Sequence, residues 1–380
     1  MSINAIQYSP APSPEATALP IELSIIVPTL NELGNVAALI SHIATALDHI
    51  GWELIFVDDD SADGTAASVR EIAKHDKRIR CVQRIGRRGL ASACVEGVLA
   101  SAADCVAIMD ADLQHDESVL PEMLQLMHSA DVDLVIGSRY ASGGSIGDWD
   151  DQRASMSRFA TALSRLVCKQ TISDPMSGFF MIRRTAFEAS VHRLSLLGFK
   201  ILLDIVASAS QPLKIAEVPY RFGTRLAGES KLDSLVMWEF GMLLLDKTVG
   251  RYVPARFISF AAVGAAGVLV HMSVLTLLLK VANVRFMIAQ AAATTGAMIF
   301  NFWLNNVLTY RDRRLHGWKL LGGLLTFMAA CSVGALANVG IASYLFMNKT
   351  QWAAAALAGV VVGAVWNYAV TQIYTWKAQK

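Results

Sequence analysis

The stretch 105-CVAIMDADLQHD-116 decides the fold of the first half of this 380-residue chain. Its leading apolar residues predict a strand that is buried on both faces of a parallel sheet. Carboxylates follow directly, at Asp110, Asp112 and Asp116. Side chains two residues apart in an extended chain point the same way, so Asp110 and Asp112 can share one hard cation, Mg²⁺ or Mn²⁺. The cation compensates charges that would otherwise repel, and it implies a polyphosphate ligand, since Mg²⁺ usually binds carboxylates together with phosphates.

Apolar runs alternate with helical segments around this stretch. The runs cover residues 23–31, 52–60, 78–85 and 131–140. This alternation predicts an α/β sandwich with a Rossmann-like sheet, and ligands of such folds bind beyond the carboxyl ends of the strands. Polar residues follow the runs, in Asn31-Glu32, Asp58-Asp59-Asp60 and Gly137-Ser138-Arg139. The sequence therefore predicts a carboxylate-rich site at one edge of the sheet.

The spacing of the acid pair does not identify the site by itself. The same Asp-x-Asp spacing occurs at positions 58/60, 131/133 and 148/150. Asp110 and Asp112 differ because they follow a buried run and because Gln114 and His115 come next.

The second half of the chain is almost entirely apolar. A membrane span takes roughly 20 apolar residues, and four segments qualify by this measure: 257–279, 286–308, 320–346 and 352–376. Basic residues gather before the first segment, between the second and third, and after the fourth. Because cytoplasmic loops carry an excess of Lys and Arg, we expect the soluble half and both termini to be cytoplasmic, at a bacterial inner membrane.

Two parts of the membrane half resemble each other. "NFWLNNVLTYR" (301–311) aligns with "NYAVTQIYTWK" (367–377), and "SFAAVGAAG" (259–267) aligns with "TFMAACSVG" (326–334). This pattern predicts a parallel repeat, in which the first two spans are equivalent to the last two. Chance similarity between apolar sequences is the alternative.

Residues 233–255 join the two halves. They are apolar but interrupted by charges. We expect amphipathic helices that lie in the membrane interface. The alternative is an ordinary amphipathic helix packed on the soluble half.

Composition excludes several classes of protein. The net charge of +1 gives no field that would attract a nucleic acid. The five cysteines form no C-x-x-C pair, which favours reduced thiols over disulfides or a zinc site. Residues 1–20 contain prolines and no long apolar run, which is typical of a flexible tail and not of a signal peptide.

Seven motifs in the soluble half now resemble a known family. They are "IIVPTLNE", "FVDDDSADGT", "MDADLQH", "IGSRY", "DPMSGFFMIRR", "GFKILLDI" and "VPYRFGTRLAGESKL". In this order they resemble family 2 glycosyltransferases of the polyprenyl (dolichyl) phosphate mannosyltransferase type, which implies a GT-A-like fold. The membrane half resembles the GtrA-like four-helix domain that some of these enzymes carry.

The resemblance implies a domain organisation. We expect a flexible tail over 1–20, a catalytic domain over 21–232, interfacial helices over 233–255 and an all-α transmembrane domain with four spans over 256–380.

The resemblance also implies roles for individual residues. Those expected to contact the donor nucleotide are Pro28, Asn31, Glu32, Val57, Asp59, Asp110, Ala111 and Asp112. The expected metal ligands are Asp110, Asp112 and Gln114. Those expected to bind the acceptor phosphate are Arg139, Arg153, Ser157, Arg225 and Lys231. Asp112 and Arg139 are the expected catalytic residues.

Some of these positions have structural alternatives. Asp59 and Asp60 could cap the next helix, and Arg153 could be a surface base near two aspartates. The sequence also departs from the family pattern at Leu30, where an aromatic residue is frequent, and at Asp204, where Glu is frequent.

The implied reaction moves a hexose, expected to be mannose from GDP-mannose, onto a polyprenyl (dolichyl or undecaprenyl) phosphate with inversion. The lipid phosphate is largely anionic at neutral pH, because its second pKa is about 6. It therefore needs no strong general base, and no His or Glu stands out as one. The expected partners are the nucleotide sugar, the lipid and the membrane, with a homo-oligomer through the membrane domain as a further option.

Other functions remain open at this point. UDP-glucose is the alternative donor. A lipid flippase or membrane scaffold with a non-catalytic transferase domain is an alternative of another class. A processive polysaccharide synthase would show a Q-x-x-R-W motif, which is absent. A nucleotidyltransferase also uses paired acids but would not explain "GSRY" or the membrane half.

Overall fold

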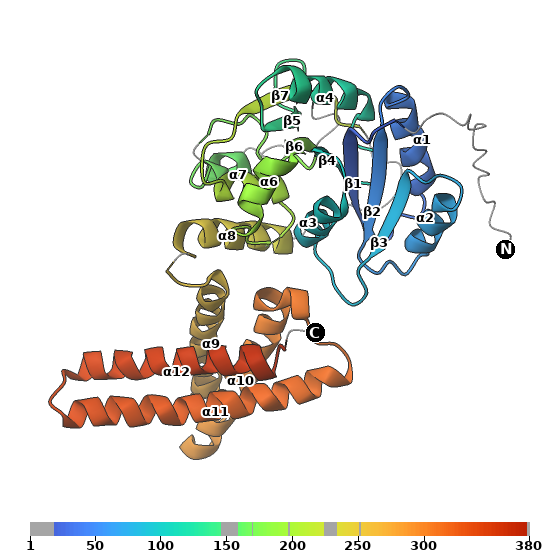
Figure 1. Ribbon diagram of the computed structural model, residues 1–380. Helices are drawn as coiled ribbons and strands as arrows, with labels where there is room; N and C mark the ends of the chain where they lie inside the picture. Colours follow the sequence, from blue (N-terminus) through green and yellow to red (C-terminus); the bar gives the residue numbers. More distant parts are fainter. Residues whose placement is uncertain are drawn as a thin grey trace, which may run out of the picture. The chain divides into compact units, whose positions relative to one another are not determined.

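The computed structural model describes residues 19–145, 159–168, 170–196, 198–223, 234–250 and 252–377. The chain divides between Thr248 and Val249 into two compact units, here called the N-terminal and C-terminal units (Figure 1). The N-terminal unit is an α/β sandwich and the C-terminal unit is built of long helices.

One mixed sheet forms the centre of the N-terminal unit. Its order is β3-β2-β1-β4-β6-β5-β7. The strands span β1 Leu23–Thr29, β2 Trp52–Asp58, β3 Ile79–Gln83, β4 Cys105–Ile108, β5 Leu134–Ser138, β6 Phe180–Arg183 and β7 Ile215–Pro219. The strands β3, β2, β1 and β4 are parallel, as the sequence predicted.

Strand β6 departs from that prediction. It lies between β4 and β5 and is antiparallel to both. A strand buried on both faces is apolar throughout, whichever way it runs, so the apolar run of β6 carries no signal of its direction. Because β6 is antiparallel to both β4 and β5, those two strands run in the same direction. The carboxyl ends of β1, β2, β4 and β5 therefore do lie at one edge, as predicted.

Helices cover both faces of the sheet. The helices α1 (Val36–Ala46), α2 (Thr65–Ala73) and α4 (Leu120–Ser129) pack on one face. The other face carries α3 (Leu90–Ala100), α6 (Arg184–Val191), α7 (Ile201–Ser208) and α8 (Ser234–Val249). Along β1 the side chains alternate between these two cores, because successive residues of a strand point to opposite faces.

Helix α8 is fastened to the sandwich. Its Phe240 and Leu243 are buried in the second core. Lys247 Nζ lies 2.6 Å from Asp204 Oδ1 and donates to Ser208 Oγ over 2.8 Å. The helix thus packs on the soluble half by one face, as the alternative interpretation of this segment expected. Its placement in a membrane interface stays a prediction.

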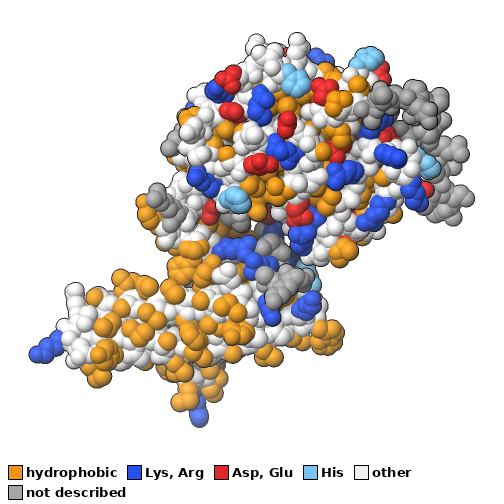
Figure 2. Space-filling view, in the orientation of Figure 1, with side chains coloured by type: hydrophobic (Ala, Val, Ile, Leu, Met, Phe, Trp, Pro, Cys, Tyr) orange, Lys and Arg blue, Asp and Glu red, His pale blue; other side chains and the backbone are white. Residues whose placement is uncertain are grey.

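The C-terminal unit consists of two helical hairpins (Figure 1). α9 (Ala255–Lys280) pairs with α10 (Phe286–Leu304), and α11 (Trp318–Met347) pairs with α12 (Trp352–Tyr374). Between the hairpins lie a π-helical turn at Asn305–Thr309 and a 3₁₀ turn, η3, at Arg311–Arg313. Exposed apolar side chains dominate the visible surface of this unit, whereas charged side chains are spread over that of the N-terminal unit (Figure 2).

Three helical stretches of the described chain are long and apolar enough to cross a membrane. They are Ala255–Lys280, Trp318–Met347 and Leu357–Tyr374. α10 has 19 residues and is long enough, but polar residues such as Gln290 and Asn301 lower its hydropathy. The fourth span therefore stays a prediction.

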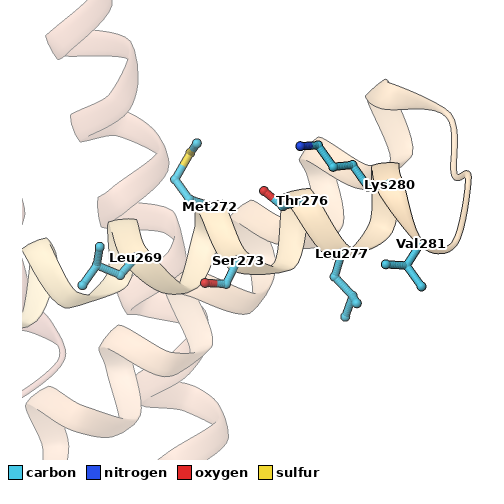
Figure 3. Close-up of a pocket in the computed structure, with 7 residues that line it drawn as sticks. All are labelled: Leu269, Met272, Ser273, Thr276, Leu277, Lys280 and Val281. Atoms are coloured by element: carbon cyan, nitrogen blue, oxygen red, sulfur yellow. The ribbon is translucent and has the colours of Figure 1, made fainter.

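Much of the surface of α9 is exposed and apolar. Its C-terminal half carries a shallow hollow lined by Leu269, Met272, Ser273, Thr276, Leu277, Lys280 and Val281 (Figure 3). All seven residues come from α9 and its end, so the hollow is an indentation of an apolar helix surface. Lys280 stands at the helix end, where a long stem can lie along apolar surface while the ammonium reaches water.

The two hairpins repeat the same contacts between polar residues and glycines. Ser259 Oγ bonds Thr309 Oγ1 over 2.7 Å, and the aligned Thr326 Oγ1 bonds Thr375 Oγ1 over 3.0 Å. A Cβ on Gly267 would lie 2.2 Å from Asn301 Oδ1, and a Cβ on the aligned Gly334 would lie 2.1 Å from Asn367 Oδ1. These equivalences support the internal repeat.

The repeats meet through aromatic rings. Tyr310 and Trp376, which are aligned with each other, stack with ring centroids 4.2 Å apart and an interplanar angle of 6°. Phe302 packs on Phe327, from the other repeat, at 5.8 Å. Around this cluster the hairpins are held together by van der Waals packing of the rings, since lipid supplies no hydrophobic drive for helix association.

The contact between Gly334 and Asn367 yields a test. A valine at position 334 would place carbon atoms where the Asn367 side chain lies, and overpacking of this kind costs roughly 1–3 kcal/mol. We expect Gly334→Val to lower the melting temperature of the detergent-solubilised protein by several degrees. Gly340→Val, in the same helix with open space around its Cα, is the control. Equal melting temperatures for the two variants would contradict close packing of α11 on α12.

Candidate active site

The loops after β1 and β2 are bonded to each other at the sheet edge. The backbone N–H of Asn31 donates to Ser61 Oγ over 2.8 Å, and Asn31 Oδ1 accepts from the N–H of Ala62 over 3.0 Å. The N–H of Glu32 donates to Thr65 Oγ1. These bonds bring the two predicted nucleotide-binding segments together and fix the Asn31 side chain within the protein.

Three residues in the loops after β1, β2 and β4 adopt left-handed backbone conformations. They are Asn31, Asp60 and Leu113, with φ of 59°, 61° and 60°. Asn and Asp tolerate this region, but a leucine there is strained by about 1 kcal/mol or more. The left-handed conformation of Leu113 turns the chain between Asp112 and Gln114 and so sets the directions in which these two side chains leave the backbone.

Pro28 and Val57 are register partners on β1 and β2. The side chain of Val57 is fully buried in the second core. The whole residue, backbone included, is 0% exposed, and contact of Val57 with a nucleotide stays a prediction.

Asp59 is held by an arginine that the sequence analysis missed. Arg84 Nη1 lies 2.5 Å from Asp59 Oδ1, and the N–H of Gly89 donates to Asp59 Oδ2 over 2.6 Å. Arg84 also donates to the carbonyl of Gly89 and to Ser92 Oγ. Gly89 has φ of 138°, a conformation that favours glycine. Asp59 thus anchors the loop after β3. It is not the N-cap of α2, which begins after Gly64.

The acid pair lies directly beyond β4. The side chain of Asp110 is 41% exposed, whereas Asp112 is nearly buried. Gln114 supports both the pair and the neighbouring β7 loop: its N–H donates to Asp112 Oδ1 over 3.3 Å, and its Nε2 donates to the carbonyl of Gly223 over 3.0 Å. Because Nε2 is engaged, Oε1 is the amide atom that could act as a metal ligand.

These residues fit a hard divalent cation. Two carboxylates and an amide oxygen are the ligand types that Mg²⁺ and Mn²⁺ prefer, and so small a protein set leaves positions for phosphate oxygens and water. In the parts of the chain that the structure describes, no group of three or more His, Cys, Asp and Glu side chains forms a metal site. The role of Asp110, Asp112 and Gln114 as ligands stays a prediction.

His115 lies immediately behind the acid pair. Burial lowers the pKa of His115 to about 4. Its imidazole is therefore neutral at physiological pH and would be a weak base.

Arg139 faces a carboxylate that sequence reasoning also missed. Its Nε lies 2.7 Å from Asp174 Oδ2, its Nη2 lies 2.8 Å from Asp174 Oδ1, and its backbone N–H also donates to Oδ2. Both side chains are buried. Phosphate binding by Arg139 stays a prediction, and the structure adds that Nε and Nη2 of its guanidinium already bind a carboxylate. The one sequence signal for Asp174 was its place in "DPMSGFF".

The remaining predicted acceptor residues are not placed. Arg153, Ser157, Arg225 and Lys231 lie outside the described residues. Ala111 is described, and it is buried between the two acids in the first core.

Two family descriptions match the chain. Residues 24–190 match "Glycosyl transferase family 2", and residues 259–376 match "GtrA/DPMS, transmembrane domain". The two matches fall in the two compact units. With the apolar helices, the second match shows that the protein is an integral membrane protein.

Three relatives named dolichol-phosphate mannosyltransferase match the chain, and one of them covers nearly all of it. The dolichol-phosphate mannosyltransferase of Pyrococcus furiosus is 32% identical over 94% of this chain and 99% of its own length. The enzyme of the same name from Mycosarcoma maydis is 36% identical over 67% of this chain and 88% of its own. That from Saccharomyces cerevisiae is 34% identical over 63% of this chain and 92% of its own.

A solved structure is similar to the chain at lower identity. Glucosyl-3-phosphoglycerate synthase from Mycobacterium tuberculosis is 22% identical, with a TM-score of 0.43, over 60% of this chain and 78% of that one. At this TM-score the likeness supports no argument about activity. The family descriptions and the relative from Pyrococcus furiosus, which matches nearly the full length, carry the assignment: the chain belongs to glycosyltransferase family 2, among the dolichol-phosphate mannosyltransferases, and is a glycosyltransferase with a GtrA-type membrane domain.

Proposed function

We propose that the protein transfers mannose from GDP-mannose to a polyprenyl phosphate at the cytoplasmic face of the membrane. The observation that carries the proposal is the acid pair Asp110 and Asp112, with Gln114, at the open edge of the sheet. The relatives named dolichol-phosphate mannosyltransferase support the choice of mannose and of a lipid phosphate.

Asp110, Asp112 and Gln114 would hold Mg²⁺ or Mn²⁺. When bound, the ion neutralises the departing diphosphate and orients it. Around it, the bonded loops of Asn31 and Asp59 form a rigid wall for the nucleotide. The carboxylate of Asp59 is engaged by Arg84, so we expect its part in binding to be indirect, through the loop that it fixes.

The acceptor supplies its own nucleophile. A phosphate oxygen of the lipid bonds to the anomeric carbon of mannose while the bond from that carbon to the diphosphate oxygen breaks, and GDP leaves. The phosphate is largely anionic at neutral pH, and His115 is neutral and weakly basic, so no side chain needs to take a proton. Attack in line with the leaving group inverts the configuration, which gives a β-linked product from the α-linked donor.

Positive charge is needed because two phosphates approach each other. Arg139 would provide it, with Asp174 fixing the plane of the guanidinium. We retain Arg153, Ser157, Arg225 and Lys231 as proposed acceptor contacts, on the resemblance of their motifs.

We also propose that α10 crosses the membrane. Phe286–Leu304 and the π-helical turn at Asn305–Thr309 are continuous and contain no ionisable residue. An even number of spans places both termini on one side, and the basic residues at the flanks and the middle connection favour the cytoplasm. In this arrangement 21–232 is the catalytic domain, 233–255 lies at the interface and 256–380 is the four-span domain.

The donor and acceptor are tested together. Membranes that contain the protein would be incubated with polyprenyl phosphate and radiolabelled GDP-mannose, UDP-glucose or UDP-N-acetylglucosamine, and the lipids extracted. We expect label in lipid from GDP-mannose, in a β linkage. Labelling from UDP-glucose alone would replace the proposed donor, and an α linkage would contradict direct inversion. No labelled lipid from any donor would favour a flippase or scaffold.

The acid pair is tested by substitution. Asp112→Asn removes one anionic ligand, and we expect kcat to fall by about 100-fold or more, as for the loss of one electrostatic stabiliser. Asp131→Asn is the matched control, because Asp131 belongs to another Asp-x-Asp pair and is exposed. Chelation with EDTA should abolish transfer, and added Mn²⁺ or Mg²⁺ should restore it. Full activity of Asp112→Asn would remove the basis of the proposed site.

Two single variants and their combination separate the structural role of the Arg139–Asp174 pair from its proposed catalytic role. Removing one partner of a buried ion pair costs roughly 3–5 kcal/mol, whereas apolar replacement of both partners is often neutral. We expect Arg139→Met and Asp174→Leu each to lower the melting temperature. The double variant should recover much of the stability and no activity. Recovery of transfer by the double variant would show that Arg139 contributes no charge to the reaction.

A further inference from the structure

His115 lies beside the acid pair, and the proposed mechanism gives it no task. Its ring is buried and stacks on Phe179, with centroids 5.1 Å apart and an interplanar angle of 16°. Tyr220 and Phe222 approach it at 5.8 and 5.9 Å. Three aromatic rings thus pack around the imidazole. The two ring nitrogens are then the groups of His115 that require polar partners.

Both ring nitrogens face the same residue, Asp110. Nδ1 accepts the backbone N–H of Asp110 over 3.4 Å. Because Nδ1 accepts this N–H, it carries no proton, and the ring proton lies on Nε2. Nε2 is 3.8 Å from Asp110 Oδ2, an electrostatic contact somewhat longer than a hydrogen bond. His115 therefore contacts both the backbone and the carboxylate of Asp110.

Gly178 lies close to the same oxygen and to the imidazole. A Cβ at this position would lie 2.9 Å from Asp110 Oδ2 and 3.5 Å from His115 Cε1. A side chain here would push on the carboxylate, so a glycine leaves the room that Oδ2 occupies. With 41% of its side chain exposed, Asp110 remains accessible to a cation from the open side.

We propose that His115 is a positioning residue for the cation site: its Nδ1 accepts the backbone N–H of Asp110 and its Nε2 lies 3.8 Å from Oδ2 of the same residue, so that Asp110 meets the ion in one orientation. The inference rests on the proposed function, because it takes Asp110 as a metal ligand. A neutral donor suits this task. It orients the carboxylate and leaves its negative charge for the cation.

The test measures Mn²⁺ binding directly. Calorimetric titration of the detergent-solubilised full-length protein, with GDP and separately with UDP, gives the Mn²⁺ affinity without turnover. His115→Phe keeps the ring stacking and removes both nitrogens, whereas His115→Gln keeps an N–H donor near the position of Nε2. We expect the Mn²⁺ affinity to fall by about 10–100-fold in His115→Phe and to stay within about threefold of the wild-type value in His115→Gln.

A kinetic measurement separates positioning from general damage. We expect excess Mn²⁺ to restore the kcat of His115→Phe towards the wild-type value, with the KM for the sugar nucleotide little changed. A distorted site would lose kcat at every Mn²⁺ concentration, and that result would overturn the proposal.

Gly178→Ala provides a second route to the same oxygen. Its methyl group presses on Asp110 Oδ2 and leaves both imidazole nitrogens in place. We expect weaker Mn²⁺ binding, at an unchanged melting temperature. Gly241→Ala, with open space around its Cα, is the control. If His115→Phe does not fold, the Mn²⁺ affinity of Gly178→Ala decides, and an unchanged affinity would overturn the proposal.

The outcomes distinguish this inference from the proposed function. If the wild-type protein binds Mn²⁺ and both His115 variants bind it equally well, or equally poorly, the positioning role fails and the proposed function stands. If the wild-type protein binds no Mn²⁺ with either nucleotide, the cation site fails and the proposed function fails with it.

Discussion

Repulsion between carboxylates is the constraint on which the rest of this active site depends. The fold brings Asp58, Asp59, Asp110 and Asp112 to one edge of the sheet, with Asp174 nearby in the loop before β6. Each of these charges requires compensation, because isolated buried charges are costly. Asp58 accepts bonds from Thr29 and Ser61, while Asp59 and Asp174 bind the arginines Arg84 and Arg139. The backbone N–H of Asp110 donates to His115 Nδ1, and Asp112 Oδ1 accepts from the N–H of Gln114.

The ion pairs of Asp59 with Arg84 and of Asp174 with Arg139 hold loops together at the same sheet edge where Asp110 and Asp112 lie. The aromatic residues Phe179, Tyr220 and Phe222 lie around His115, and Phe222 also packs under the Arg139 guanidinium at 5.5 Å. They link the acid pair to the Arg139 and Asp174 pair through apolar contact. Low polarity around such groups strengthens the electrostatic interactions among them.

The membrane unit satisfies a different constraint. Its helices satisfy their own backbone hydrogen bonds, so specificity must come from side-chain packing and from a few polar contacts. Both hairpins use the same solution, a glycine against an asparagine amide and a hydroxyl pair near the helix ends. The stacked rings of Tyr310 and Trp376 then join the hairpins. A duplicated hairpin accounts for all of these matches, because equivalent residues make equivalent contacts.

Local pattern in the sequence determined five of the strands, the helices between them, the long apolar segments and the strand ends that carry polar residues, since burial and periodicity act over a few neighbouring residues. The acid pair at Asp110 and the family motifs belong to that information. Local pattern did not identify β6 and β7 as strands. The reversed strand β6 and the partners Arg84 and Asp174 were decided only by the tertiary structure. Arg84 lies 25 residues from Asp59, and Asp174 lies 35 residues from Arg139. Local sequence pattern does not show such pairings. They form only when the chain folds, because a buried charge is costly unless an opposite charge lies beside it.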